Sequence, residues 1–169
     1  GSQYTQLIAR RVRESGVYSI VKSNNISKKE LFDLNPSGII LSGGPDSITS
    51  KKKHNLSRNI LNSNIPILGI CYGMQLITDF FKGKVKSSQK KEFGHAVFNI
   101  SKSSKLFYGL TKSKNLNVWM SHSDKVIKLP KGFESLGSSS NTKFAAMYSS
   151  EKNIYCLQFH PEVTHTDNG

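Results

Sequence analysis

The chain has 169 residues, a length that suits one domain with its own core, and it contains no apolar run long enough to span a membrane. The sequence also predicts no signal peptide, and two cysteines are too few for a disulfide framework, which favours a reducing, cytoplasmic setting. The net charge of +13 is carried by scattered lysines without interleaved aromatic residues, so we interpret it as a solvated basic surface. The alternative is attraction of anionic nucleotides or of an acidic partner surface, and a nucleic-acid-binding motif is not predicted.

The first half of the chain alternates helices with short apolar strands. Apolar residues at helical spacing predict an amphipathic helix over residues 4–14, and Ser27 with Glu30 predicts a capping box that opens a helix over residues 28–34. Further expected elements are strands at 17–21, 38–42 and 67–70 and helices at 55–62 and 72–81. This alternation is typical of a doubly wound α/β fold with a mostly parallel or mixed central sheet and flanking helices.

The second half changes to strands joined by turns. The expected strands are residues 96–100, 116–120, 133–138, 144–148 and 154–159. The chain begins with a helix, whereas a doubly wound sheet begins with a strand that lies inside the sheet. We therefore expect residues 1–169 to form a single domain that lacks its first strand, which would leave the neighbouring strands without hydrogen-bonding partners.

A cysteine lies between the strand at 67–70 and the helix that follows it. Residues 69–73 read G-x-C-x-G, the pattern of a nucleophile elbow, in which a tight turn lifts the nucleophile above the sheet. The start of the helix favours a thiolate at Cys71, and the backbone N–H of Tyr72 can face a developing oxyanion. The alternative is a buried structural cysteine, and the pentapeptide alone leaves both open.

A cysteine nucleophile needs a base, and five histidines are available: His54, His95, His122, His160 and His165. His160 follows an apolar strand, at the kind of strand end where ligands bind in this fold class. Glu162 lies two residues on, so its carboxylate can reach the imidazole and fix its tautomer, while Pro161 stiffens the turn. A lone His-Pro-Glu would be interpreted as a surface turn. Together with the elbow pattern at Cys71, it makes His160 the favoured base.

Two further segments follow strands or interrupt them. Gly44, in the Ser-Gly-Gly-Pro stretch after the strand at 38–42, is a candidate second oxyanion donor, with an ordinary strand-to-helix turn as the alternative. Asp124 lies in the polar segment 119–125 and could hold a substrate ammonium, although that segment alone favours a solvated turn. Cys156 is interpreted as a core residue. No Cys or His pair has zinc-ligand spacing, and no phosphate-binding glycine motif is present, so no metal is predicted.

Taken in order, the GGP, G-x-C-x-G and H-P-E motifs resemble those of the class I, triad-type glutamine amidotransferases. The match covers essentially the whole chain. The finer resemblance is to the amidotransferase domain of GMP synthase, and it rests on the segments GSQYTQLIARRVRE, LSGGPDS, GICYGMQ, EFGHA, VWMSHSDKV and QFHPEVTHT.

The resemblance implies a role for each candidate residue. Cys71 attacks the carboxamide of glutamine, His160 takes the thiol proton and returns it to departing ammonia, and Glu162 orients His160. Gly44 and Tyr72 supply the oxyanion N–H groups. Asp124 would face the α-ammonium of glutamine, and the full set of implied glutamine-binding residues is Gln75, Ser121, His122 and Asp124.

The resemblance also implies partners. Ammonia would pass to an ATP-pyrophosphatase synthase domain, fused or separate, that aminates XMP to GMP. No cofactor is expected in this domain, while ATP and Mg²⁺ are expected in the partner, and a homodimer could form through the C-terminal region beyond this chain. The alternatives are a glutaminase subunit of another amidotransferase and a catalytically silent regulatory domain of the same fold.

Overall fold

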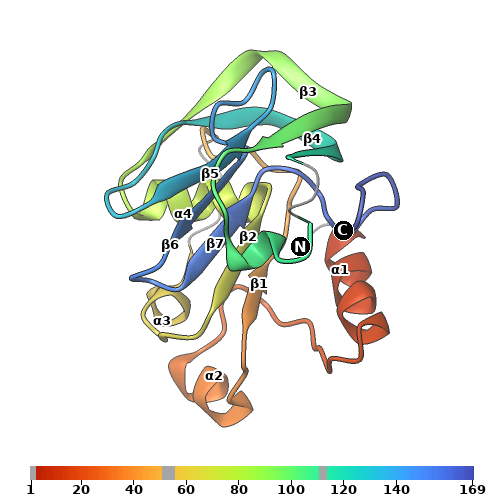
Figure 1. The fold of residues 1–169 in the computed structure, drawn as a ribbon. Helices are drawn as coiled ribbons and strands as arrows, with labels where there is room; N and C mark the ends of the chain where they lie inside the picture. Colours follow the sequence, from red (N-terminus) through yellow and green to blue (C-terminus); the bar gives the residue numbers. More distant parts are fainter. Residues whose placement is uncertain (1–2, 51–55, 111–113) are drawn as a thin grey trace.

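The structure of this chain is a computed structural model that describes residues 3–50, 56–110 and 114–169 (Figure 1). Within these residues, seven strands form one mixed sheet in the order β1-β2-β7-β6-β5-β3-β4. Neighbours β1, β2 and β7 are parallel, and every other pair is antiparallel. The strands are β1 (Ile39–Leu41), β2 (Ile67–Ile70), β3 (Lys84–Ile100), β4 (Asn115–Lys128), β5 (Glu134–Ser138), β6 (Ala146–Ser149) and β7 (Ile154–Leu157). The predicted α/β class with a mixed central sheet is confirmed.

Helices cover both faces of the parallel part of this sheet. Successive side chains of a strand point to opposite faces, and in β2 the side chain of Ile67 packs with Met74 and Ile77, whereas that of Ile70 packs with Ile8. The helix that carries Ile8 therefore lies on the opposite face from the helix that carries Met74 (Figure 1). The helices are α1 (Gln3–Glu14), α2 (Lys28–Leu34), α3 (Arg58–Leu61) and α4 (Tyr72–Phe80), with a 3-10 turn at Lys105–Phe107.

Helix α2 begins and ends where its sequence predicts. The Ser27 hydroxyl accepts a hydrogen bond from the backbone N–H of Glu30 at 3.1 Å, which satisfies one of the unpaired donors of the first turn. The Glu30 carboxylate pairs with Lys22 at 2.9 Å. Asn35 ends the helix in the left-handed conformation, with φ of 41°.

Two elements of the first half differ from prediction. Residues 17–21 form no strand, and Val17 and Tyr18 are 57% and 85% exposed, because no described strand lies beside them to share hydrogen bonds. The helix expected at 55–62 is reduced to α3, and residue 55 lies outside the described part of the chain. β1 lies at one edge of the sheet. The single domain without its first strand stays a prediction.

Strands β3 and β4 are much longer than the sequence predicts and form an arched ribbon above the rest of the sheet (Figure 1). The solvated turn favoured at residues 119–125 is wrong, because the segment lies inside β4, paired with β3 on either side of an irregularity between Ser87 and Glu92. Burial alternates along β4, so that polar side chains share its inner face with apolar ones. The inward residues of this segment are Met120, His122, Asp124 and Val126.

The parallel pairing of β2 with β7 brings Cys71, the predicted nucleophile, close to His160, its predicted base. Ile70 pairs with Leu157, so Cys71 and the residues after Leu157 leave the sheet at the same edge. Cys156 is fully buried in the core beneath α4, as predicted, and its burial raises the pKa of its thiol. No helix among the described residues is long and apolar enough to cross a membrane.

Candidate active site

Cys71 lies in a strained turn between β2 and α4. Its φ of 51° and ψ of −104° put a non-glycine residue in an unfavourable region, which a packed surrounding must hold in place. A Cβ on Gly73 would lie 2.2 Å from the carbonyl oxygen of Leu41, and one on Gly69 would lie 2.7 Å from Ile77 Cδ1. Glycines on both sides of the cysteine therefore let α4 pass close to β1 and β2, and the side chain of Cys71 is lifted above the sheet edge.

His160 and Glu162 form a buried pair beside this turn. His160 Nδ1 lies 2.7 Å from Glu162 Oε1, and both side chains are almost fully buried. A carboxylate can only accept, so Nδ1 carries the hydrogen and Nε2 is left for the thiol. The loop is fixed by hydrogen bonds from Arg11 Nε to the Glu162 carbonyl at 3.0 Å and from Thr166 Oγ1 to the His160 carbonyl at 2.6 Å.

The surroundings of His160 favour its protonated form. Burial by itself lowers the pKa of the imidazole, but hydrogen bonds with Cys71 and Glu162, reinforced by their negative charges, overcome it and raise the pKa to about 10. The pair can therefore hold a proton taken from the Cys71 thiol. The ring of Tyr4 lies 5.1 Å from the His160 ring, so α1 covers this side of the site.

The loop after β1 lies against Cys71 and His160. A Cβ on Gly43 would be 3.1 Å from His160 Cε1 and 3.7 Å from Cys71 Cβ, and one on Gly44 would be 3.2 Å from the Tyr72 ring. The structure thus brings together Gly44 and Tyr72, the two predicted oxyanion donors. Their role in binding an oxyanion stays a prediction.

Ser121 and Asp124, two predicted glutamine-binding residues, reach the site from β4. The Ser121 carbonyl accepts from Cys71 Sγ at 3.6 Å. The Asp124 carboxylate is buried and accepts a hydrogen bond from the hydroxyl of Ser47, which belongs to the loop after β1. The middle of β4 therefore contacts both Cys71 and this loop.

Gln75 and His122, the other two predicted glutamine-binding residues, point into the protein. Gln75 Nε2 donates to the Asp124 carbonyl at 2.8 Å, and His122 Nδ1 lies 3.0 Å from the same oxygen. His122 Nε2 lies 3.2 Å from Glu92 Oε2, within ion-pair distance but off the axis of a hydrogen bond. These side chains fix the backbone of β4 at Asp124.

Glu92 is one of the buried polar residues near the site that sequence reasoning missed. Its carboxylate accepts hydrogen bonds from Ser139 at 2.8 Å and from Thr142. Burial raises the pKa of Glu92, but the adjacent His122 imidazole and hydrogen bonds from Thr142 and Ser139 outweigh it and lower the pKa to about 2. The buried Gln158 was also missed, although a single amide between Leu157 and Phe159 in an apolar strand is a signal that could have found it.

The other histidines lie away from this centre. His95 and His165 pack around Trp119, with ring centroids 5.1 Å and 4.6 Å from its ring, and His54 lies outside the described residues. No group of three or more His, Cys, Asp or Glu residues in the described part of the chain could hold a metal ion.

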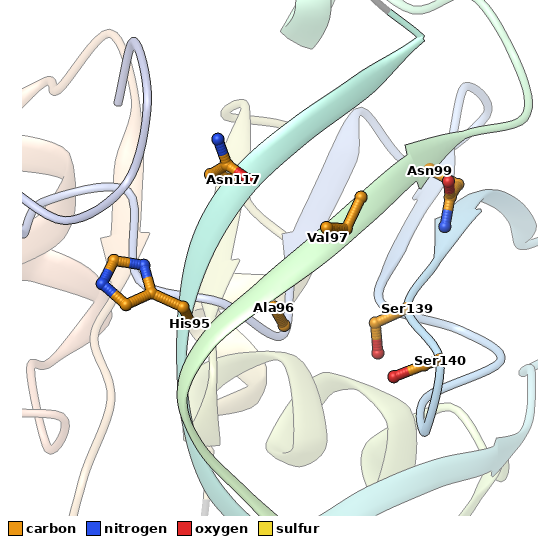
Figure 2. Close-up of a pocket in the computed structure, with 7 residues that line it drawn as sticks. All are labelled: His95, Ala96, Val97, Asn99, Asn117, Ser139 and Ser140. Atoms are coloured by element: carbon orange, nitrogen blue, oxygen red, sulfur yellow. The ribbon is translucent and has the colours of Figure 1, made fainter.

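Two hollows in the surface of the described residues have no contribution from Cys71 to their lining. One, of about 400 Å³, lies on the outer side of β3 and β4 and is lined by none of the predicted site residues (Figure 2). Figure 2 shows Val97 of β3 and Asn117 of β4 on one side of it, with Ser139 and Ser140 from the connection after β5 on the other. The second, of about 440 Å³, lies between α1 and β2 and has Glu162 in its wall.

Known proteins share this fold and much of this sequence. The family model for Glutamine amidotransferase class-I matches residues 1–169. This chain belongs to the class I glutamine amidotransferase family. The amidotransferase chain is 51% identical over its full length to the GMP synthase [glutamine-hydrolyzing] of Staphylococcus saprophyticus and 48% identical to that of Maridesulfovibrio salexigens. It spans 32% and 33% of those two proteins, about a third of their length.

Solved structures agree with this assignment. A crystal structure of a GMP synthase subunit from Thermoplasma acidophilum matches with a TM-score of 0.84 and 34% identity, over 99% of this chain and 83% of that one. A glutamine amidotransferase of Thermotoga maritima has a TM-score of 0.73 over 93% of this chain and 70% of that one; at 21% identity it supports the fold alone.

Proposed function

We propose that this amidotransferase chain hydrolyses glutamine to glutamate and ammonia. The Cys71 thiol gives its proton to His160, and the sulfur attacks the carboxamide carbon of glutamine. The oxygen of the tetrahedral intermediate binds the N–H groups of Gly44 and Tyr72. His160 then protonates the departing ammonia, which leaves a glutamyl thioester, and a water molecule deprotonated by His160 releases glutamate.

The single observation that carries this proposal is the buried His160–Glu162 pair next to the strained Cys71. A structural cysteine needs neither a left-handed turn nor a histidine whose protonated form is favoured by the sulfur itself. Asp124 adds the means to recognise an amino acid, because its buried carboxylate faces the loop after β1 and can pair with an α-ammonium.

We propose further that the ammonia serves the ATP-dependent amination of XMP to GMP by a synthase domain, fused or separate. The support is the 51% identity with a GMP synthase that is about three times as long as this chain, which leaves room in that protein for the second activity. The glutaminase chemistry uses only side chains and needs no cofactor, and ATP and Mg²⁺ would belong to the synthase domain.

Covalent labelling tests the glutaminase proposal without depending on a partner. The glutamine analogue 6-diazo-5-oxo-L-norleucine should alkylate Cys71, glutamine should protect against it, and peptide mass spectrometry should locate the adduct. Cys71→Ala should abolish labelling, whereas Cys156→Ala, a buried cysteine in β7, should not. Absence of glutamine-protected labelling at Cys71 would refute the proposal and favour a catalytically silent domain.

The acceptor is tested separately, with the synthase domain present. Glutamine-dependent formation of GMP from XMP and ATP is expected, and Cys71→Ala should remove it while free ammonium restores it. Glutamine hydrolysis without amination of XMP would instead assign this chain to another amidotransferase.

A further inference from the structure

A chain of buried side-chain amides reaches Cys71. Gln158 is fully buried, and its Nε2 lies 3.6 Å from Cys71 Sγ, a normal distance for an N–H···S hydrogen bond. Its Oε1 accepts from Gln75 Nε2 at 3.4 Å, and that nitrogen also donates to the Asp124 carbonyl at 2.8 Å. The sulfur is thus connected to the backbone of β4 through two side chains.

The direction of this chain does not depend on how the two amides are assigned. The carbonyl of Asp124 can only accept, so the atom of Gln75 that faces it must be the amide nitrogen. The second hydrogen of that nitrogen points to Gln158, which must present its oxygen. The remaining end of Gln158, which faces Cys71 Sγ, is therefore its NH₂ group.

The hydrogen bonding of the Cys71 sulfur changes when it loses its proton, because a thiol can donate a hydrogen bond and a thiolate can only accept. As a thiol, Cys71 donates to the carbonyl of Ser121 at 3.6 Å. When the proton moves to His160 and the electron pair stays on sulfur, that carbonyl turns from an acceptor into a repulsive neighbour. The NH₂ of Gln158 then becomes more strongly bound, because a hydrogen bond to a charged acceptor is stronger than one to a neutral acceptor.

We propose that Gln158 is a further catalytic residue of this site, which stabilises the Cys71 thiolate by donating its amide hydrogen to the sulfur. Gln75 is its positioning residue, since it fixes which end of the Gln158 amide faces Cys71. The role in glutamine hydrolysis rests on the function proposed above, whereas the effect on the thiolate is a property of Cys71 alone. Both amides are almost fully buried, as a water-excluded hydrogen bond requires.

Alkylation of Cys71 by iodoacetamide across pH 5–10 tests the effect on the thiolate, because only the thiolate reacts. Gln158→Met keeps the length of the side chain and removes the donor. Loss of one hydrogen bond to a charged group should slow alkylation of Cys71 about tenfold at pH 7 and move its pH profile about one unit upward. Gln158→Glu, nearly isosteric, should move it further, because a carboxylate repels the thiolate.

The matched control is Cys156→Ala, which alters a fully buried residue of the same region and leaves the contacts of the Cys71 Sγ atom intact. Peptide mass spectrometry locates the adduct, and circular dichroism with urea unfolding shows which variants are folded. If Gln158 had only a structural role, folded variants would lose stability like the control and keep the pH profile of wild type. An unchanged profile in a folded Gln158→Met or Gln158→Glu variant overturns the proposal.

Glutamine hydrolysis by the same variants separates this inference from the proposed function. The expected result is a roughly tenfold lower kcat for Gln158→Met with little change in KM, because the lost bond acts on the nucleophile and not on bound glutamine. A displaced alkylation profile in a chain whose wild type hydrolyses no glutamine with the synthase domain present would refute the glutaminase function and retain the role of Gln158 toward the sulfur. A raised KM with unchanged kcat would overturn the catalytic role.

Discussion

The buried carboxylate of Glu92 offers the sharpest test of how β4 is held in place. We expect Glu92→Gln to destabilise the protein at neutral pH, because the variant keeps the shape of the side chain and removes its charge. In the structure, His122, Ser139 and Thr142 surround this carboxylate, and they lower its pKa from 4.5 to about 2. Because each pKa unit corresponds to about 1.4 kcal/mol, the ionised form contributes about 3 kcal/mol to the free energy of unfolding.

The pH dependence of this contribution follows from its sign. The pKa is lower in the folded than in the unfolded chain, so the contribution is fully present above about pH 5 and is lost as the pH falls toward 2. At pH 3.5 about 2 of the 3 kcal/mol should remain. The difference in unfolding free energy between wild type and Glu92→Gln should therefore be largest at pH 7 and shrink by about 1 kcal/mol at pH 3.5.

Urea unfolding followed by circular dichroism, at several pH values from 7 to 3.5, measures this difference. Glu134→Gln is the matched control, because Glu134 is 58% exposed and pairs with the exposed Lys102, so its replacement should cost less than about 1 kcal/mol at any of these pH values. A Glu92→Gln variant as stable as wild type at pH 7, or a difference that does not change with pH, would show that the carboxylate is not held ionised by its neighbours.

Three further predictions concern the turn at Cys71, the imidazole of His160 and a helix cap. Gly73→Ala should destabilise the protein by several kcal/mol or prevent folding, since its Cβ would lie 2.2 Å from the Leu41 carbonyl. Urea unfolding checks this, with Gly38→Ala as the comparison, because a Cβ there would lie 3.7 Å from the Pro66 carbonyl, an ordinary contact. The imidazole of His160 should show no titration by NMR between pH 6 and 8, and Glu162→Gln should bring its pKa down toward that range; a wild-type midpoint near 6.5 would contradict this. Ser27→Ala should cost about 1 kcal/mol in unfolding free energy through loss of the α2 cap, and an unchanged stability would show that the cap is replaced by water.

Local sequence rules worked where one strong local interaction decides the structure. Helix α2 is one example, because a serine hydroxyl and a left-handed asparagine fix both of its ends. The turn at Cys71 is another, because glycines on both sides of a cysteine are needed wherever a helix passes this close to two strands. Residues 17–21 show the limit: the apolar pattern is that of a strand, but a strand also needs a neighbour, and none lies beside it in the described residues.

The full length of strands β3 and β4 was not predicted, for a related reason. Lysines along β3 and polar residues along β4 hide the alternation that sequence analysis relies on. In the structure the alternation is present, but its inner positions include His122 and Asp124, whose side chains lie against Glu92 of β3 and Ser47 of the loop after β1. A buried polar residue is indistinguishable from an exposed one until its partner is known.

The sequence by itself determined the α/β class, the position of the nucleophile turn and the residues Cys71, His160 and Glu162 as candidates, because these depend on short-range spacing and on the chemistry of single side chains. Only the tertiary structure decided which groups surround the sulfur. Gln158 directly follows β7, Gln75 lies in α4, and the carbonyl of Ser121 belongs to β4. These groups meet only once β2 has paired with β7 and β4 has folded over α4. Hydrogen bonds act over about 3 Å, so residues 50 to 87 positions apart in the chain can contact the sulfur only through the packing of the whole domain.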